Sequence, residues 1–320
     1  MLDFFSSWTP DLLGFWPVLH TPGGGWLAIA DPAEGAAAIG SPAVTIFQAI
    51  ILGIVQGLTE FLPISSTAHL KVVPVMLGWG DPGVAFTAVI QLGSIGAVLW
   101  YFWQDLTQLV KGTATAIAAR DYEAQEFRLS LGILIGSLPI IFLGLCVKFL
   151  VAEFYDTVLR STLAIAIVSI VMALLLGLAE RLSHHKRSFN DLTTQDGILM
   201  GLAQAMALIP GVSRSGSTLT AGLFLGLDRA TAARFSFLLG IPAITIAGLT
   251  ELPGLLTTDL SQGGLLPLIA GVLSAAFFSY ASIAWLLRYL QTQNAWVFVW
   301  YRLGFGAFLL AAIAGKALPL

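Results

Sequence analysis

Apolar segments recur along this chain, and most of them are long enough to span a membrane as a helix, which restricts the folds that the chain can adopt. They fall at about 45–62, 67–78, 84–103, 128–150, 159–181, 196–209, 217–227, 235–252, 265–290 and 295–316. A helix of about 20 apolar residues crosses the hydrocarbon core and satisfies its own backbone there. Only 10% of the residues are charged, against about a quarter in a soluble domain. We therefore predict an all-α polytopic membrane protein.

Four of these segments are short and form two pairs, 45–62 with 67–78 and 196–209 with 217–227. A polar break containing proline joins each pair, which is typical of a helical hairpin that enters the membrane and returns. Gly53 to Gln56 matches Gly201 to Gln204 at an offset of 148, while Pro63 and Ser66 match Pro210 and Ser213 at 147. We predict an inverted repeat of two halves, about 45–182 and 196–316, each a re-entrant hairpin plus about three transmembrane helices, with the functional site where the interrupted segments meet.

Basic residues fix the expected orientation of this membrane domain, 45–320. Four loop regions expected on one face, 104–128, 181–195, 228–234 and 288–295, hold nine of the fifteen Lys and Arg residues. The positive-inside rule makes that face cytoplasmic and places the open end of the first hairpin outside. Residues 1–44 contain no basic residue, so they do not match a secretory signal. We predict a poorly ordered or interfacial extension there.

The first break combines a carboxylate, hydroxyls and a histidine. Gln56 and Glu60 lie four residues apart and share a helix face. Glu60 sits inside an apolar segment, where an ionisable group is costly and indicates function. Ser65, Ser66 and Thr67 can cap the next helix, and a hydroxyl beside a histidine is the minimal activated nucleophile. We predict catalytic roles for Glu60, Ser66 and His69, with Ser66 as nucleophile and His69 as its base; a water activated by His69 is equally compatible.

The second break reads Pro210-Gly211-Val212-Ser213-Arg214-Ser215-Gly216-Ser217-Thr218. A helix N-terminus is a ready anion site, and an arginine adds donors for phosphate oxygens. We predict that this stretch binds a phosphate group, and that Arg214 is also catalytic. The predicted binding residues are Gly211, Ser213, Arg214, Ser215 and Thr218, together with Ser65 from the first break. Such a set of groups suits phosphoryl transfer, which needs positive charge, a nucleophile and a proton acceptor.

These two motifs, over a chain segment of about 45–316, resemble the undecaprenyl-pyrophosphate phosphatase family that is linked to bacitracin resistance. The resemblance rests on Gln56-x-x-x-Glu60, on Pro63 to His69, and on Pro210 to Thr218. It implies hydrolysis of a C55 lipid pyrophosphate to the monophosphate at the outer side of the bacterial cytoplasmic membrane, with a divalent cation. We expect Glu60, with Gln56 as a neutral partner, to position Mg²⁺ or Ca²⁺. Many members have Glu in place of Gln56, so Glu60 should carry the charge-dependent work.

The expected partners are the polyprenyl pyrophosphate and the lipid bilayer, and a homodimer stays open. A net charge of −3 argues against a nucleic-acid partner. The alternative function is a transporter or flippase of lipid carriers, because inverted repeats with broken helices also occur in transporters. A transporter would need the binding arginine but no paired nucleophile and base.

Overall fold

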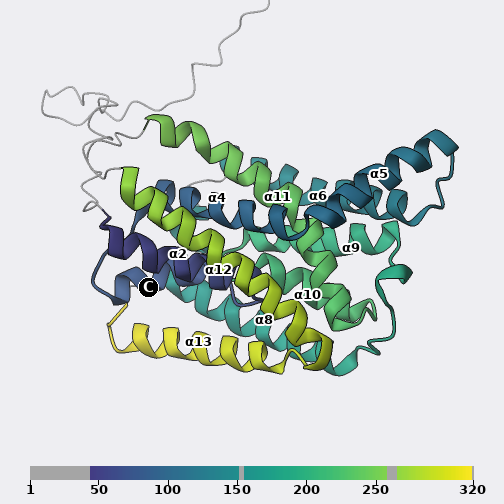
Figure 1. Cartoon of the computed structure of the whole chain (residues 1–320). Coiled ribbons are helices and arrows are strands. Elements are labelled where there is room, and N and C mark those ends of the chain that lie inside the picture. The colour runs from purple at the N-terminus through teal and green to yellow at the C-terminus, as the bar shows by residue number, and fades with distance from the viewer. Residues whose placement is uncertain (1–43, 151–154, 258–264, 319–320) are drawn as a thin grey trace, which may run out of the picture. The chain divides into compact units, whose positions relative to one another are not determined.

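The computed structural model describes residues 44–150, 155–257 and 265–318, and this part of the chain is helical (Figure 1). All but the last residue of the predicted extension 1–44 lies outside these residues. The first half contains α2 (Ile46–Phe61), α3 (Ser66–Met76), α4 (Gly83–Tyr101), α5 (Trp103–Ala119), α6 (Gln125–Leu150), the π-helical turn η1 (Tyr155–Leu159) and α8 (Thr162–Leu182). The second half contains η2 (Phe189–Asp191), α9 (Thr194–Ala205), η3 (Met206–Leu208), α10 (Arg214–Phe224), α11 (Arg229–Thr257), α12 (Leu265–Thr292) and α13 (Trp296–Ala314).

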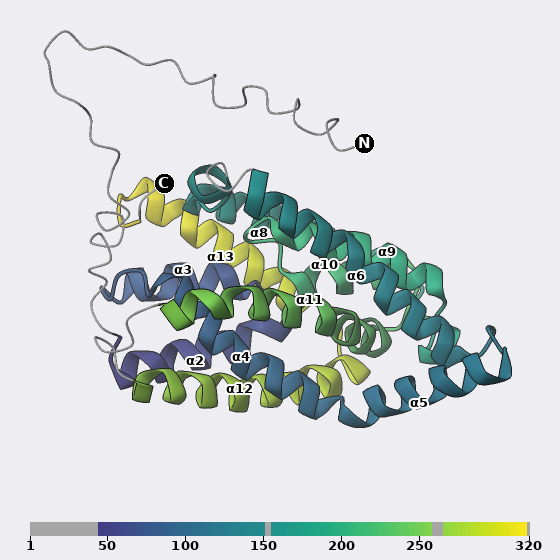
Figure 2. The same ribbon diagram turned by 90° about the horizontal axis from the view of Figure 1, so that it is seen from above.

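Five helices among the described residues are long and apolar enough to cross a membrane: α6, α8, α11, α12 and α13. The pair α4 and α5 forms a sixth candidate, bent by 63° at a short break. The prediction of an all-α polytopic membrane protein is confirmed. Figure 2 shows the long helices running side by side, with the short helices α3 and α10 packed among them.

The order of elements repeats along the chain. The hairpin α2–α3 precedes the long helices α4, α6 and α8, and the hairpin α9–α10 precedes α11, α12 and α13. The threonine N-caps Thr45 and Thr193, each part of a reciprocal capping box, lie 148 residues apart. The inverted orientation of the second half stays a prediction of the sequence.

Each hairpin packs against the middle long helix of the other half. Gly53 and Gly57 of α2 lie so close to α12 that a Cβ on Gly53 would come within 2.5 Å of the Gly271 carbonyl oxygen. On the other side, a Cβ on Gly201 of α9 would come within 2.1 Å of the Gly136 oxygen of α6. Small residues spaced by four allow this close approach of helices inside a bilayer. The glycine spacing therefore locks the two halves together.

Helix α5 was not predicted from the sequence, which assigned 104–128 to a loop region. Its mixed composition carries too many polar residues for a span, yet Leu109 and Ala116 are buried on one face. It packs against the start of α6, where the Thr113 hydroxyl hydrogen-bonds to Ser130 at 2.7 Å. Tertiary packing of an amphipathic stripe, rather than overall apolarity, makes this segment helical.

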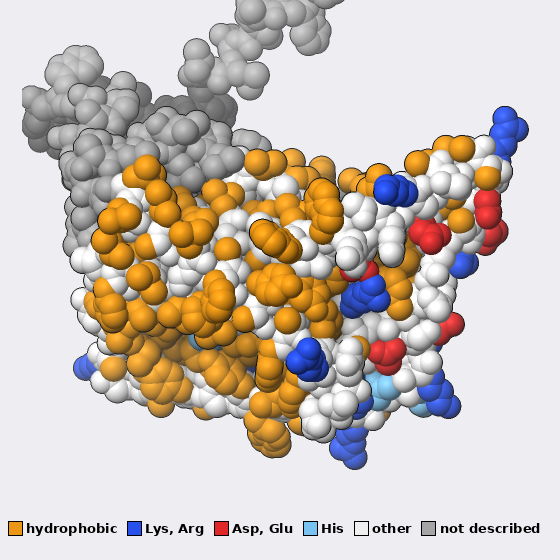
Figure 3. All heavy atoms as spheres, in the orientation of Figure 1, with side chains coloured by type: hydrophobic (Ala, Val, Ile, Leu, Met, Phe, Trp, Pro, Cys, Tyr) orange, Lys and Arg blue, Asp and Glu red, His pale blue; other side chains and the backbone are white. Residues whose placement is uncertain are grey.

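The surface of the described part divides into an apolar region and a charged end (Figure 3). Apolar side chains such as Phe277, Leu273 and Trp285 of α12 are exposed over the flank of the bundle, as expected for lipid contact. In that view most Lys, Arg, Asp and Glu side chains gather at the end that carries the far tip of α5. This asymmetry matches the predicted bias of basic residues toward one face.

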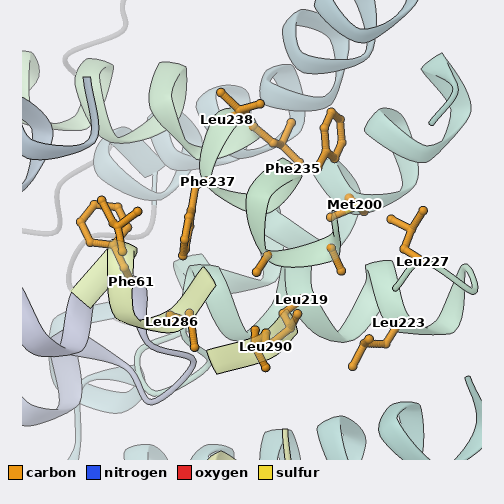
Figure 4. Packing of buried hydrophobic residues seen from close by; sticks show 14 of the residues in the cluster. Phe61, Met200, Leu219, Leu223, Leu227, Phe235, Phe237, Leu238, Leu286 and Leu290 are labelled. Carbon is orange, nitrogen blue, oxygen red and sulfur yellow. The ribbon is translucent and has the colours of Figure 1, made fainter. Parts of the chain in front are cut away.

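The largest buried cluster joins the first hairpin to the second half (Figure 4). Phe61, the last residue of α2, meets Phe237 of α11 edge-on at a centroid distance of 5.4 Å. Leu219 and Leu223 of α10 and Met200 of α9 extend the same cluster. Close van der Waals packing of these side chains, rather than their removal from water, fixes the end of α2 beside α10 and α11.

Candidate active site

In each hairpin a turn and the first residue of the following helix, 62–66 and 209–214, form what we call the hairpin tip. The two tips meet at a pocket of about 230 Å³. Both short helices, α3 and α10, begin at this pocket, so their positive dipole ends converge on it. Gln56 and Glu60 of α2 and Gln91 of α4 line it as well. Apolar side chains from α6, the second break and α11 complete the wall, among them Ile140, Ile209 and Ile244.

Glu60 contacts three other polar side chains of the pocket. Its carboxylate accepts a hydrogen bond from the Ser66 hydroxyl at 2.7 Å and one from the Gln56 amide nitrogen at 3.3 Å. The other carboxylate oxygen lies 3.5 Å from a guanidinium nitrogen of Arg214. The side chains of Glu60 and Arg214 are only about a tenth exposed. The structure therefore brings together the carboxylate, hydroxyl and arginine that the sequence singled out.

Arg214 lines the pocket, and its guanidinium group pairs with Glu60 at 3.5 Å. Its three side-chain nitrogens are buried and have no hydrogen-bond partner among the described residues. The group lies against Gly240 of α11, where a Cβ would come within 1.9 Å of it. It also lies over the ring of Phe61, 5.9 Å from the centroid. A buried cation that lacks hydrogen bonds is costly, and a phosphate group would supply the missing acceptors.

The backbone turns sharply just before each short helix. Ser65 and Ser213, the N-cap residues of α3 and α10, have φ values of 76° and 72°. Non-glycine residues rarely adopt positive φ, and such conformations concentrate at functional sites. These two serines lie 148 residues apart, so Ser65 is the counterpart of Ser213, and Ser66 is the counterpart of Arg214. This corrects the sequence alignment of Ser66 with Ser213: the offset is 148 both at Gln56 and Gln204 and at the two N-cap serines, so only the prolines are out of register by one residue.

The predicted phosphate-binding residues divide into two groups. Gly211, Ser213, Arg214 and Ser65 line the pocket. Ser215 instead donates its hydroxyl to the Leu62 carbonyl at 2.9 Å, which ties the start of α10 to the first break.

Thr218 also points away from the pocket. Its hydroxyl donates to the Arg214 carbonyl at 2.8 Å and pairs with the Ser236 hydroxyl of α11. Ser215 and Thr218 therefore hold the tip in place rather than face a ligand.

His69 is not brought to the Ser66 hydroxyl. Its Nδ1–H donates to the Ser65 carbonyl at 2.8 Å. In the neutral ring, Nε2 accepts from the Tyr301 hydroxyl at 2.6 Å. The ring also stacks on Phe305 at a centroid distance of 4.4 Å. The predicted pairing of His69 as base with Ser66 is therefore not supported by this geometry, in which Glu60 receives the Ser66 hydrogen bond.

Arg302 of α13 is a residue of the site region that the sequence reasoning missed. It is 1% exposed and donates to the Pro63 carbonyl of the first break at 3.1 Å. It also donates to the Gly211 and Val212 carbonyls of the second break, at 2.6 and 3.0 Å. An arginine inside an apolar segment signals function by the same rule that identified Glu60. Arg302 therefore fastens the two tips to each other.

The residues around Glu60 fit a cation that is shared with a phosphate, rather than a complete protein cage. Within the described residues, no group of three or more His, Cys, Asp or Glu side chains could hold a metal. Mg²⁺ is commonly bound by one or two carboxylates plus substrate phosphate oxygens and water. Glu60 supplies one carboxylate at the pocket. Gln56 turns its amide nitrogen toward Glu60, so in this geometry it orients the carboxylate.

An ion pair anchors the second hairpin at its charged end. Arg187 donates to both carboxylate oxygens of Asp196, at 2.8 and 2.6 Å, and the Thr193 hydroxyl donates to the same carboxylate. Burial raises the pKa of Asp196, but the hydrogen bonds from Arg187 and Thr193 outweigh it and hold that pKa below its ordinary value. The start of α9 is therefore fixed by a charged side chain.

Comparison with known proteins agrees with the two motifs. The chain matches the sequence profile of the family described as bacitracin resistance protein BacA over residues 49–308. A protein of Trichormus variabilis named undecaprenyl-diphosphatase is 65% identical over 275 residues, which is 86% of each chain. Proteins of the same name from a Nostoc species and a Synechocystis species are 63% identical over 90% of each chain, and 64% identical over 84% of this chain and 83% of the relative.

Proposed function

Because this chain belongs to the BacA family of bacitracin resistance proteins, we propose that it is an undecaprenyl-diphosphate phosphatase. It hydrolyses undecaprenyl pyrophosphate to undecaprenyl phosphate and inorganic phosphate. This reaction recycles the lipid carrier of peptidoglycan synthesis and confers resistance to bacitracin. The observation that carries the proposal is the contact of Glu60 with both Ser66 and Arg214 inside one buried pocket.

The geometry supports a role for each of these three groups. Arg214 and the first turn of α10 hold the pyrophosphate by charge and by the helix dipole. The Ser66 oxygen attacks the terminal phosphorus while its proton passes to Glu60, 2.7 Å away. The bond to the bridging oxygen breaks, and its electron pair leaves with the lipid monophosphate. Glu60 then gives this proton to the departing lipid monophosphate or to solvent and is again a carboxylate. Water next attacks the phosphoserine and passes its proton to Glu60, which returns that proton to the Ser66 oxygen as inorganic phosphate leaves.

A divalent cation, Mg²⁺ or Ca²⁺, is part of the proposal. When bound, it neutralises phosphate oxygens and lowers the cost of charge development at phosphorus. Glu60 is the carboxylate that would hold it, and Gln56 would keep that carboxylate oriented through the 3.3 Å hydrogen bond. His69, with Tyr301 and the Ser65 carbonyl, fixes the backbone turn that presents Ser66.

The multi-pass protein lies in the bacterial cytoplasmic membrane, with the pocket opening to the outer side. The support is the charge bias of the sequence and the gathering of charged side chains at the end that carries the tip of α5 (Figure 3). The apolar residues Ile140, Ile209 and Ile244 give the prenyl chain a wall to follow out of the pocket. A homodimer stays a prediction of the sequence.

The transporter alternative finds no support in the names of the relatives, which describe a diphosphatase. The pocket also holds more than a binding cation, because a hydroxyl and a carboxylate form a hydrogen bond within it. A binding site alone would not need that pair.

The decisive experiment is phosphate release from C55 pyrophosphate by the purified full-length protein in detergent, with Mg²⁺ and with a chelator. We expect Arg214→Ala and Glu60→Ala each to lower the rate by about 10²–10³-fold, and chelation to abolish it. Thr115→Ala changes an exposed residue of α5 and controls for differences in expression and purification; it should keep the wild-type rate. Release that survives both substitutions would overturn the assignment of the site.

Rapid quenching with labelled substrate separates the two nucleophiles. A phosphoserine that appears in the wild type and is lost in Ser66→Ala supports the covalent route. Hydrolysis at the normal rate by Ser66→Ala would assign the attack to water instead.

A further inference from the structure

The hydrogen-bonding side chains of α4 lie on one face of the helix. Between positions 83 and 99 they belong to Thr87, Gln91 and Ser94, which are spaced by four and by three residues and so share a face. Ser94 is fully buried, and its hydroxyl accepts a hydrogen bond from the Gln56 amide of α2 at 3.3 Å. Thr87 and Gln91 line the pocket at the two tips. This face of α4 is therefore turned toward the first hairpin and the pocket.

Gln91 differs from Ser94 because the fold does not use its polar group. The Ser94 hydroxyl accepts a second hydrogen bond, from Ser279 of α12 at 2.8 Å. The Gln91 side chain is half-buried, and its amide forms no hydrogen bond with another described residue. The proposed reaction assigns it no role either. Two N–H donors and a carbonyl oxygen are thus available at Gln91 to a ligand in the pocket.

The second half of the repeat carries a leucine at the position of Gln91. Gln91-Leu92-Gly93 of α4 aligns with Leu238-Leu239-Gly240 of α11 at an offset of 147. Leu238 is 1% exposed and belongs to the largest buried cluster. The repeated scaffold therefore packs with an apolar side chain at this position. Folding does not require an amide there, which favours a role for Gln91 in the site.

The direction of attack determines where a second phosphate of the substrate lies. The attacking and leaving oxygens are roughly in line through the phosphorus, so the bridging oxygen lies opposite the Ser66 oxygen. The phosphate that carries the prenyl chain therefore extends away from Ser66 and needs another wall of the pocket. Helix α4 is such a wall, because it belongs to neither tip. Gln91 lies about 4.5 Å along the axis of α4 from Ser94, which contacts the first hairpin.

We propose that Gln91 is a specificity-determining residue, whose amide N–H groups bind the lipid-bearing phosphate of the pyrophosphate. This inference rests on the proposed phosphatase reaction. The N–H groups donate to oxygens of the second phosphate, while Arg214 holds the terminal one. A neutral amide binds a phosphate less tightly than a cation does, so the lipid monophosphate can leave after the bond breaks. A ligand with a single phosphate lacks the group that Gln91 binds, so the residue favours diphosphates.

The first test compares a diphosphate with a monophosphate without turnover. Methylenediphosphonate, which cannot be hydrolysed at its bridge, and inorganic phosphate are each titrated against the full-length protein in detergent with Mg²⁺. In Gln91→Leu we expect the Kd of the diphosphonate to rise roughly tenfold, the effect of one lost hydrogen bond to a charged group. The Kd of phosphate should stay within about twofold.

Gln104→Leu is the matched control for this titration, because it removes the same amide from an exposed position of α5. It should leave both dissociation constants unchanged. Unchanged binding of the diphosphonate by Gln91→Leu would overturn the proposal. An equal loss for both ligands would overturn it too, because Gln91 would then bind the terminal phosphate or support the pocket as a whole.

The second test uses hydrolysis of C55 pyrophosphate. An interaction made equally in the bound substrate and in the transition state changes KM more than kcat, so Gln91→Leu should raise KM roughly tenfold. Gln91→Glu keeps the size of the side chain but replaces its donors with a carboxylate, and it should raise KM at least as much. A folded Gln91→Glu variant with wild-type KM would contradict the proposal. If the wild type hydrolyses no lipid, the proposed function fails, and the diphosphonate titration still decides the role of Gln91.

Discussion

The two hairpins share one scaffold and differ in the chemistry of their tips. Both begin with a threonine-capped helix, pack through glycines against the other half, and turn through a serine with positive φ. The first residue after that turn is Ser66 in one hairpin and Arg214 in the other. The repeat thus supplies the same position twice, once for a hydroxyl and once for a cation. The repeat gives both turns the same backbone geometry, and the proposed reaction depends on the two side chains that differ between them.

The largest loss of activity is expected from substitution of Ser66 in the first tip, and Ser215 beside the second tip provides the comparison. Ser66→Ala should lower hydrolysis by about 10³-fold, because it removes the hydroxyl that donates to Glu60. Ser215→Ala removes only the hydrogen bond to the Leu62 carbonyl and should lower the rate by about tenfold or less. Steady-state phosphate release from both variants tests this difference. Equal losses would mean that both tips serve the chemistry alike.

Substitution of Arg302 should affect both tips together. Arg302→Met keeps the bulk but loses the hydrogen bonds to Pro63 and Gly211, so Ser66 and Arg214 shift relative to each other. We expect kcat to fall by about 10²-fold, as a misplacement of about 1 Å can cause, with a smaller change in KM. Arg302→Lys should recover part of the loss. A folded Arg302→Met variant with wild-type kcat would show that the hydrogen bonds of Arg302 are not needed to position Ser66 and Arg214.

Packing should be equally strict on both hairpins. Gly201→Ala and Gly53→Ala place a Cβ within 2.1 and 2.5 Å of a neighbouring carbonyl oxygen, so each should cost about 1–3 kcal/mol through overpacking. Gly96→Ala in α4, where a Cβ meets nothing within 4 Å, is the control. Thermal stability in detergent measures all three. A stable Gly201→Ala beside an unstable Gly53→Ala would break the equivalence of the hairpins.

The smallest expected effect is a pH dependence confined to the second hairpin. Its capping box uses Asp196, whose pKa is lowered, whereas the first uses the neutral Gln48. The stabilisation by Asp196 is complete above its unfolded pKa of about 3.9 and is lost as the pH falls through the folded pKa. Asp196→Asn should therefore lower the free energy of unfolding by about 1 kcal/mol at pH 7. The difference between this variant and the wild type should shrink toward pH 3. An effect of Gln48→Ala should not depend on pH over this range.

Much of the site could be predicted because ionisable groups stand out in an apolar sequence. Glu60 and Arg214 lie in segments where lipid would penalise them, and the structure places them 3.5 Å apart. Arg302 carries the same signal, because its neighbours in α13 are aromatic and aliphatic. The hairpins were predicted from their short length and their prolines.

The remaining features depend on contacts that spacing does not encode. His69 was paired with Ser66 because they are three residues apart, yet Tyr301, 232 residues away, accounts for the orientation of the ring. Ser215 and Thr218 look like phosphate ligands in the motif, but their hydroxyls bind carbonyl groups of the protein. Helix α5 is amphipathic, so a search for apolar runs passes over it.

The exchange of packing partners between the halves also sets an order of assembly during synthesis. Gly201 finds its partner Gly136 in chain already made, so the second hairpin can dock as soon as it is inserted. Gly53 must wait for Gly271, more than two hundred residues later, which takes roughly 10 to 40 s at ordinary rates of translation. Arg302, which ties the tips together, emerges later still. The hydrogen bonds of Arg302 to both turns can therefore form only after nearly the whole chain has been made.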